Sequence, residues 1–156
     1  MTTETTPKDA VEYQPDPEHL ALVVRLEEAD DAAPERFVLV RDADEQPLRL
    51  LDVAMPASGA SVEEVVADVL RTRLGVEPAE GAVSCPERRP RRTARWREGH
   101  VGTGWVRAVA VTVAADLDPV PPLTAAEVLP LDEAEAALTT SLERALLHDG
   151  AALLDA

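Results

Sequence analysis

The segment Ser61-Val-Glu-Glu-Val-Val-Ala-Asp-Val-Leu-Arg-Thr-Arg-Leu-Gly-Val76 decides the fold. Ser61 with Glu64 fits a capping box, in which the serine side chain accepts from a first-turn N–H and the glutamate reaches back to the serine N–H. Apolar residues then recur at helical spacing on one face: Val62, Val65, Val66, Val69, Leu70 and Leu74. Gly75 stands where a helix C-cap belongs. The pattern predicts an amphipathic helix from Ser61 to Leu74.

Apolar runs of strand length lie on both sides of this helix. They are His19–Leu26, Arg36–Arg41, Pro47–Val53, Gly104–Ala115 and Glu127–Leu131. The run Gly104–Ala115 is apolar at almost every position, which predicts a central strand covered on both faces.

Two more helices are expected near the C-terminus. One is capped by Asp132, and the other begins at about Ser141 and buries Leu142, Leu146 and Leu153. Three strands, a helix, two strands and two helices predict an α/β fold with a mixed sheet and helices on both faces.

The length sets the domain organisation. A chain of 156 residues has room for one domain with a real core. Residues 1–17 are polar, carry three prolines and show no periodicity, so we expect a flexible N-terminal leader. Residues 18–156 are expected to form the domain.

Composition limits the classes of function. The formal net charge of −15 marks an acidic protein and argues against general nucleic-acid binding and against binding to anionic membranes. No apolar run approaches the ~20 residues of a transmembrane helix, and the N-terminus lacks the apolar core of a signal peptide. The single cysteine, Cys85, cannot form an internal disulfide. These features predict a cytoplasmic protein.

Three local features resemble the Nudix domain. Val53-Ala-Met-Pro-Ala-Ser-Gly59 leads into the Ser61 helix and then into Gly75-Val76, as the family's Leu-Pro-Gly-Gly strand end leads into its helix and Gly-hydrophobic pair. Glu127-Val-Leu-Pro-Leu-Asp-Glu-Ala134 is similar to the family's strand that passes into a helix, and a Leu-rich helix closes the chain. The resemblance covers roughly residues 19 to 150. It implies a Nudix-like α/β/α sandwich with a mixed β-sheet.

The acidic signature of that family is degenerate. Anchored on Gly75-Val76, the metal-binding glutamates of the Nudix box fall on Ala60, Val69, Thr72 and Arg73, and its arginine falls on Asp68. In that family the carboxylates hold Mg²⁺ or Mn²⁺ against a pyrophosphate. The resemblance therefore implies a pseudoenzyme with no metal site and no cofactor. Mg²⁺ enters only if another active site has been built.

The most unusual segment is Pro86–Arg97, with six arginines between positions 88 and 97. Arginines grip phosphates and carboxylates through paired hydrogen bonds, and tryptophan stacks on bases. We identify the candidate ligand-binding residues as Arg92, Arg95, Trp96, Arg97, His100 and Trp105. Two other interpretations are a solvated Arg-rich loop that pairs with the protein's own acids, and a contact between subunits.

Candidate catalytic groups are few. Gly99-His-Val-Gly-Thr-Gly104 is expected to be a flexible loop beside the sheet, in which His100 could act as an acid or base. Glu63 and Asp68 are the weak acidic candidates, and Cys85 is expected to be a quiet thiol. His19 and His148 are expected at the ends of elements.

Three functions stay open. The first is a diverged Nudix-fold protein that binds a small anionic or nucleotide-like ligand, or a protein partner, in a regulatory or accessory-biosynthetic role. The second is an enzyme with a relocated active site that uses groups such as His100, Arg95, Glu63 or Asp68. The third is a homodimeric interaction module built on the Arg-rich segment.

Overall fold

The computed structural model describes residues 19–27, 35–55, 59–79, 81–82, 91–97, 100–114, 117–121 and 123–155. For residues 91–97, 100–105 and 155 it describes the backbone alone. The predicted leader, residues 1–17, lies outside the described residues, as do Cys85 and most of the predicted acidic turn before Glu35.

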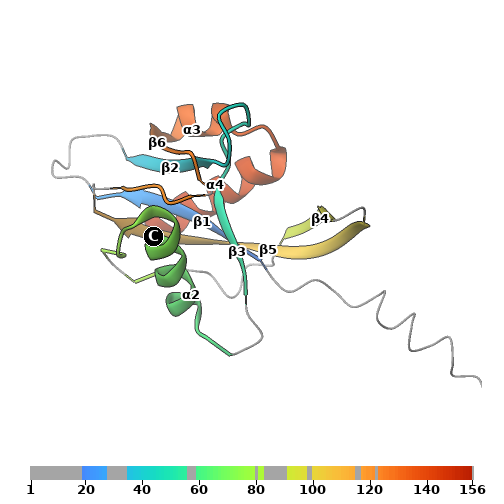
Figure 1. The fold of residues 1–156 in the computed structure, drawn as a ribbon, viewed down its shortest axis with the longest axis horizontal. Helices are drawn as coiled ribbons and strands as arrows, with labels where there is room; N and C mark the ends of the chain where they lie inside the picture. Colours follow the sequence, from blue (N-terminus) through green and yellow to red (C-terminus); the bar gives the residue numbers. More distant parts are fainter. Residues whose placement is uncertain are drawn as a thin grey trace, which may run out of the picture.

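A six-stranded mixed sheet runs through the molecule (Figure 1). Its strands are β1 (His19–Leu26), β2 (Arg36–Arg41), β3 (Leu51–Ala54), β4 (Arg91–Arg97), β5 (His100–Val113) and β6 (Ala125–Pro130). The order is β4-β5-β1-β2-β6. β1 runs parallel to β5, and the other pairs are antiparallel. The predicted mixed sheet is confirmed.

Two strands pair with the edge of β1 that lies opposite β5. Residues 19–22 of β1 pair with β3, whereas Val24 and Arg25 pair with β2. Because β2 and β3 take different parts of one edge, they separate from each other along the sheet.

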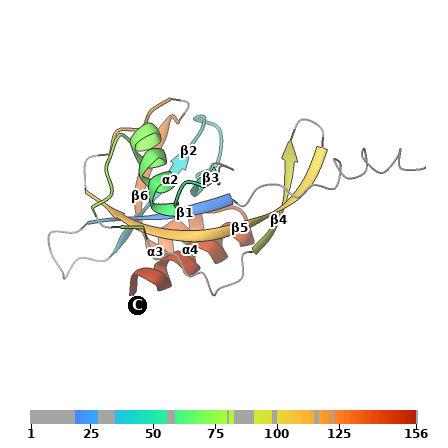
Figure 2. The same ribbon diagram turned by 90° about the horizontal axis from the view of Figure 1, so that it is seen from below.

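Helices cover both faces of the sheet, as predicted (Figure 2). One face carries α2 (Val62–Val69), which continues as the π-helical turn η1 (Leu70–Leu74). The other face carries α3 (Leu131–Ala137) and α4 (Ser141–Asp155).

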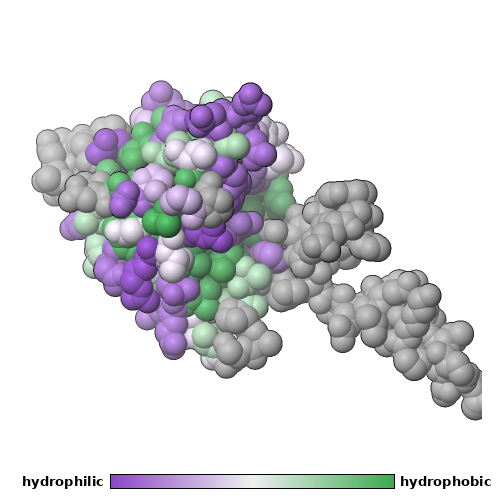
Figure 3. Space-filling model, viewed as in Figure 1, coloured by the Kyte–Doolittle hydropathy of each residue, from purple (hydrophilic) through white to green (hydrophobic). Residues whose placement is uncertain are grey.

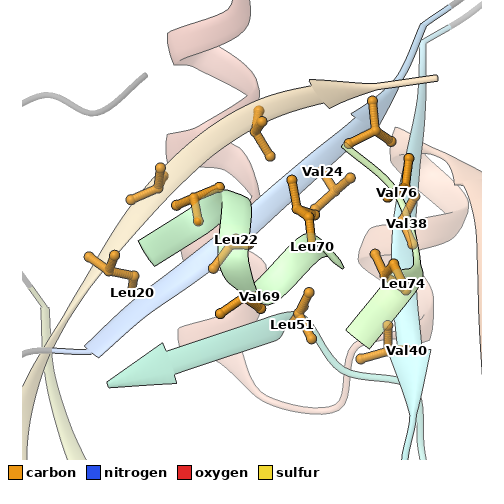
Figure 4. Close-up of a cluster of buried hydrophobic side chains, with 14 of the residues drawn as sticks. Leu20, Leu22, Val24, Val38, Val40, Leu51, Val69, Leu70, Leu74 and Val76 are labelled. Carbon is orange, nitrogen blue, oxygen red and sulfur yellow. The ribbon is translucent and has the colours of Figure 1, made fainter. Parts of the chain in front are cut away.

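Strand alternation divides the core into two clusters. Leu20, Leu22 and Val24 of β1 pack with Leu70 and Leu74 under the first helix (Figure 4). Ala21 and Val23 pack toward the α3–α4 face. β5 behaves in the same way, since Val109 belongs to the first cluster and Ala108 to the second. The prediction that this strand is covered on both faces is confirmed for its C-terminal half.

The first helix follows its sequence signals. The Ser61 hydroxyl oxygen accepts from the Glu64 N–H at 3.2 Å, and the hydroxyl donates to the Glu64 carboxylate at 3.2 Å. The capping box predicted that the Glu64 carboxylate accepts from the Ser61 backbone N–H. In the structure the carboxylate accepts from the Ser61 hydroxyl instead. Gly75 ends the helix at φ 62°, a left-handed conformation that glycine adopts without steric cost.

Three predictions about secondary structure are wrong, and one interpretation is excluded for residues 91–97. The glycine-rich segment is predicted to be a flexible loop, and a loop is one of the interpretations of the Arg-rich segment. Residues 91–97 instead form β4, and His100–Gly104 form the first part of β5. Antiparallel pairing between the two strands satisfies backbone groups that a loop would leave to water. The predicted order therefore lacked one strand.

The start of β3 was also placed too early. Pro47 has no N–H, and Arg49 forms an isolated bridge with Val40, so β3 begins only at Leu51. Asp132 is not the cap of α3, because Pro130 occupies that position and Asp132 lies in the first turn, accepting from the Glu133 N–H.

The C-terminal helix begins at Ser141, as predicted. Leu146 is buried, but Leu142 and Leu153 are only partly buried, and the helix buries Leu147 instead. His19 lies at the start of β1, as expected, whereas His148 lies inside α4 with its Nε2 atom 2.9 Å from the Glu135 carboxylate.

No described helix is long and apolar enough to cross a membrane.

Candidate functional site

An open cleft of about 890 Å³ lies along α2, and we call it the α2 cleft. β3 forms one wall through Val53 and Ala54, and the segment after η1 forms another through Pro78, Ala79, Gly81 and Ala82. The floor comes from the helix. Its apolar residues are Ala60, Val65, Val66, Ala67 and Val69. Figure 3 shows hydrophobic residues reaching the surface between α2 and β3, with hydrophilic residues to either side.

The sequence pattern of the helix explains this cleft. Glu64, Ala67 and Arg71 recur at intervals of three or four residues, so they share one side of the helix, and Ala60 directly precedes its N-cap Ser61. The two alanines are small, and they leave a hollow where larger side chains would have filled the space against β3. These small residues are the signal in the sequence that could have located the cleft.

Among the described residues, four charged side chains line the cleft. Glu63, Glu64 and Asp68 are exposed carboxylates, and Arg71 is the cation. Glu63 reaches toward the far wall, since its Oε1 atom would be 3.9 Å from a Cβ placed on Gly81. The structure thus brings the predicted candidates Glu63 and Asp68 to one cleft.

The box positions do not fit a divalent cation. Ala60 offers only a methyl group, and Val69 is a buried apolar residue. The Thr72 hydroxyl donates to the Asp68 carbonyl at 2.9 Å. Arg73 contributes positive charge, which acts with the stronger Arg49 hydrogen bond to lower the pKa of Asp42. Within the described residues, no three His, Cys, Asp or Glu side chains gather into a metal-binding group.

The predicted ligand-binding residues lie elsewhere, in the hairpin formed by β4 and β5. Only residues 106–113 of β5 pair with β1, so residues 100–105 and their β4 partners extend beyond the start of β1. Figures 1 and 2 both show this hairpin extending away from α2.

The register of the hairpin divides the candidates into two sets. Arg92 pairs with Trp105 and Trp96 pairs with Val101, whereas Arg95 pairs with Gly102 and Arg97 with His100. Directly paired residues share a face of a sheet, and successive residues alternate between faces. Arg92, Trp96 and Trp105 therefore belong to one face of the hairpin, and Arg95, Arg97 and His100 to the other. The side chains themselves lie outside the described part of the molecule.

The sheet, its two helical layers and the cleft beside the first helix together define a three-layer α/β/α protein. Comparison with solved structures shows which fold this is. A NUDIX hydrolase from Listeria monocytogenes superposes with a TM-score of 0.65 at 8% identity, over 89% of this chain and 95% of that one. The protein described here has the Nudix fold.

Two further structures agree. The Escherichia coli dihydroneopterin triphosphate pyrophosphohydrolase gives a TM-score of 0.65 at 9% identity, covering 90% of this chain and 97% of that one. The NUDIX domain of Shewanella oneidensis NrtR, complexed with ADP ribose, gives 0.58 at 13% identity and covers 99% of both chains. No family model matches the sequence. No curated protein matches it either. Since the identities are this low, the likeness establishes the fold and leaves the function to the site.

Proposed function

We propose that this chain is a Nudix-fold binding protein that holds a small molecule in the α2 cleft, in a regulatory or accessory-biosynthetic role. It does not hydrolyse pyrophosphates by the box-type metal mechanism. One observation carries the proposal: the α2 cleft is of ligand size, yet a methyl group and other unsuitable groups stand at the positions that the resemblance assigns to metal-binding carboxylates. Its predicted cytoplasmic location rests on the acidic charge and on the single Cys85.

A nucleotide-like ligand has the support of the Shewanella domain, which is complexed with ADP ribose. The phosphates of such a ligand would need cations. The α2 cleft supplies Arg71, whereas Arg92, Arg95 and Arg97 lie in the hairpin. A nucleotide in the screen therefore tests for binding at the hairpin as well as for binding in the α2 cleft.

The experiment is a thermal-shift screen followed by calorimetry on each hit. The panel contains ADP ribose, nucleotides, sugar nucleotides, acyl and prenyl diphosphates, nucleosides and organic amines, each with and without Mg²⁺. A ligand that binds the native state raises the melting temperature by mass action. We expect at least one hit that does not require metal.

A matched pair of variants locates the hit. Ala67→Phe fills the α2 cleft, whereas Ala152→Phe places the same ring on an exposed position of α4, in the opposite layer. Binding should weaken more than about tenfold in Ala67→Phe, since about 1.4 kcal/mol already corresponds to a tenfold change, and should persist in Ala152→Phe. A panel without hits, or binding unchanged by Ala67→Phe, would contradict the proposal.

A second candidate is an enzyme with a relocated active site. It is favoured by Glu63 and Asp68, which line the same cleft and could serve as acid or base groups. Chromatography of every hit after incubation would detect a product. Turnover that is lost in both Glu63→Gln and Asp68→Asn, with folding retained, would replace the binding proposal by this one.

A third candidate is the homodimer. It is favoured by the position of the Arg-rich strand β4 at one edge of the sheet, where another chain can be added. Sedimentation velocity at low and high salt tests it, since exposed ion pairs are screened by salt. A dimer that dissociates as salt rises would support this arrangement, and a monomer at every salt concentration would remove it.

A further inference from the structure

The lining of the α2 cleft combines an apolar interior with an acidic rim. Its helical floor and both walls are made of alanine, valine, proline and glycine. The charged residues of its described lining, Glu63, Glu64, Asp68 and Arg71, all lie on one helical segment. A ligand that fills the cleft must therefore present apolar surface to the floor and meet these charges at the rim.

The cation of the rim is already engaged. The Arg71 guanidinium donates to the Glu77 carboxylate at 3.2 Å, so its charge is largely balanced within the protein. The Glu64 carboxylate accepts from the Ser61 hydroxyl, which holds it at the start of the helix. Within the described part of the chain, neither the Glu63 nor the Asp68 carboxylate makes a hydrogen bond or an ion pair. The charge left over at the rim is negative.

We infer that the α2 cleft takes an apolar molecule that carries one positive charge, such as an organic ammonium. This inference rests on the proposed function and names the ligand class of that same site. An ammonium next to Glu63 or Asp68 gains Coulomb energy, whereas a phosphate would meet the same carboxylates with like charge. The net charge of −15 adds a long-range field of the same sign.

A bare metal ion does not fit this cleft. The described lining is mostly apolar, and no three metal-ligating side chains gather in the described part of the chain. An organic cation satisfies both features at once, because its apolar body is removed from water while its charge stays at the exposed rim.

The test uses three probes with one apolar body and different charges. Naphthylmethylamine is the cation, naphthylacetate the anion and naphthylmethanol the neutral reference. Dissociation constants are measured by calorimetry, and saturation-transfer NMR reports contact with the ring. We expect the amine to bind at least about threefold to fivefold tighter than the alcohol, the size of one exposed ion pair, and the carboxylate to bind weakest.

Two pairs of substitutions separate local charge from net charge. Glu63→Gln with Asp68→Asn should weaken binding of the amine about threefold to fivefold for each carboxylate removed. The affinity for the alcohol should stay unchanged. Asp44→Asn with Glu133→Gln removes the same charge from exposed positions outside the α2 cleft, and should change neither. A higher salt concentration should weaken binding of the amine more than binding of the alcohol.

The outcomes keep this inference distinct from the proposed function. The inference is overturned if naphthylacetate binds tightest. It is also overturned if the three probes bind with equal affinity in the Glu63/Asp68 double variant and in the Asp44/Glu133 double variant alike. In either case binding to the α2 cleft itself stands. Absence of binding by all three probes also overturns it, and the wider panel with Ala67→Phe then decides the proposed function. An amine whose affinity falls only in the Glu63/Asp68 variant upholds the inference.

Discussion

Gly150 of α4 lies directly against Val23 of β1, so that a Cβ on the glycine would overlap the Cβ and both γ-methyl groups of the valine. Val23 is fully buried at the centre of the sheet. The contact sets how closely the C-terminal helix approaches the sheet, and any larger residue at position 150 must push the two layers apart.

Gly150→Ala should therefore destabilise the protein by about 1–3 kcal/mol, the usual cost of overpacking. The sign of the change is decisive. An unobstructed glycine inside a helix would gain about 1 kcal/mol on replacement by alanine. Urea unfolding measures the difference, and a gain in the free energy of unfolding would show that the layers are not in contact here.

Gly75→Ala should cost about 1–2 kcal/mol, because its backbone has φ 62°. The new Cβ would also meet the Cβ of Asp118 at 3.1 Å and its carbonyl oxygen at 3.2 Å. Gly81→Ala is the matched control, since its Cβ would lie no closer than 3.9 Å to any neighbour in the described part of the chain. Equal melting temperatures for the two variants would refute this explanation.

Glu143→Ala should cost about 1–3 kcal/mol, the usual penalty for a buried donor left unsatisfied. The Glu143 carboxylate accepts the N–H of Leu50 at 2.9 Å, and Leu50 is buried. The same carboxylate accepts from the Thr140 hydroxyl at the start of α4. Glu143→Gln keeps an acceptor and should recover most of the loss. If both variants unfold at the same urea concentration, the Leu50 contact is not the cause.

Asp42→Asn should lower stability at neutral pH by about 0.5–1 kcal/mol, the range for partly exposed ion pairs. The Arg49 guanidinium hydrogen-bonds both Asp42 oxygens, at 2.7 and 2.8 Å, and lowers the pKa of that carboxyl, while partial burial opposes the change. Because the folded-state pKa lies below the unfolded value, the contribution is present above the ordinary aspartate pKa. It is lost as the pH falls through the folded-state pKa.

The measurement for Asp42 is urea unfolding of both proteins at neutral pH and at a series of acidic values. The gap between wild type and Asp42→Asn should shrink as the carboxyl becomes protonated. A gap that stays constant across this range would mean that the Arg49 pair does not contribute through charge.

Local signals were enough wherever a few neighbouring residues decide the conformation. The bounds of β1 and β2 follow from apolar runs, and the end of the first helix follows from Gly75. The candidate acids Glu63 and Asp68 were also named from the sequence, and both line the α2 cleft. That the cleft also includes β3 and the segment after η1 could not be predicted from the sequence, because this depends on contacts between segments distant in the chain.

The β4–β5 hairpin marks the limit of sequence reasoning. An arginine-rich stretch followed by glycines has weak strand propensity, so the sequence favours a loop for the glycines and leaves a loop among the interpretations of the arginines. Pairing along seven consecutive positions overrides that propensity, and the register then divides the Arg and Trp candidates between two faces. Tertiary pairing decided both results.

By itself, the sequence determined the mixed α/β class, the helical layers, the capped first helix and the absence of carboxylates at the positions that the Nudix box assigns to metal binding, since periodicity, capping and side-chain chemistry are local properties. Only the tertiary structure decided that Ala60 and Ala67 line a cleft together with β3, and that Gly150 lies directly against Val23. Burial and close approach depend on which surfaces meet, and distant segments meet only when the chain has folded.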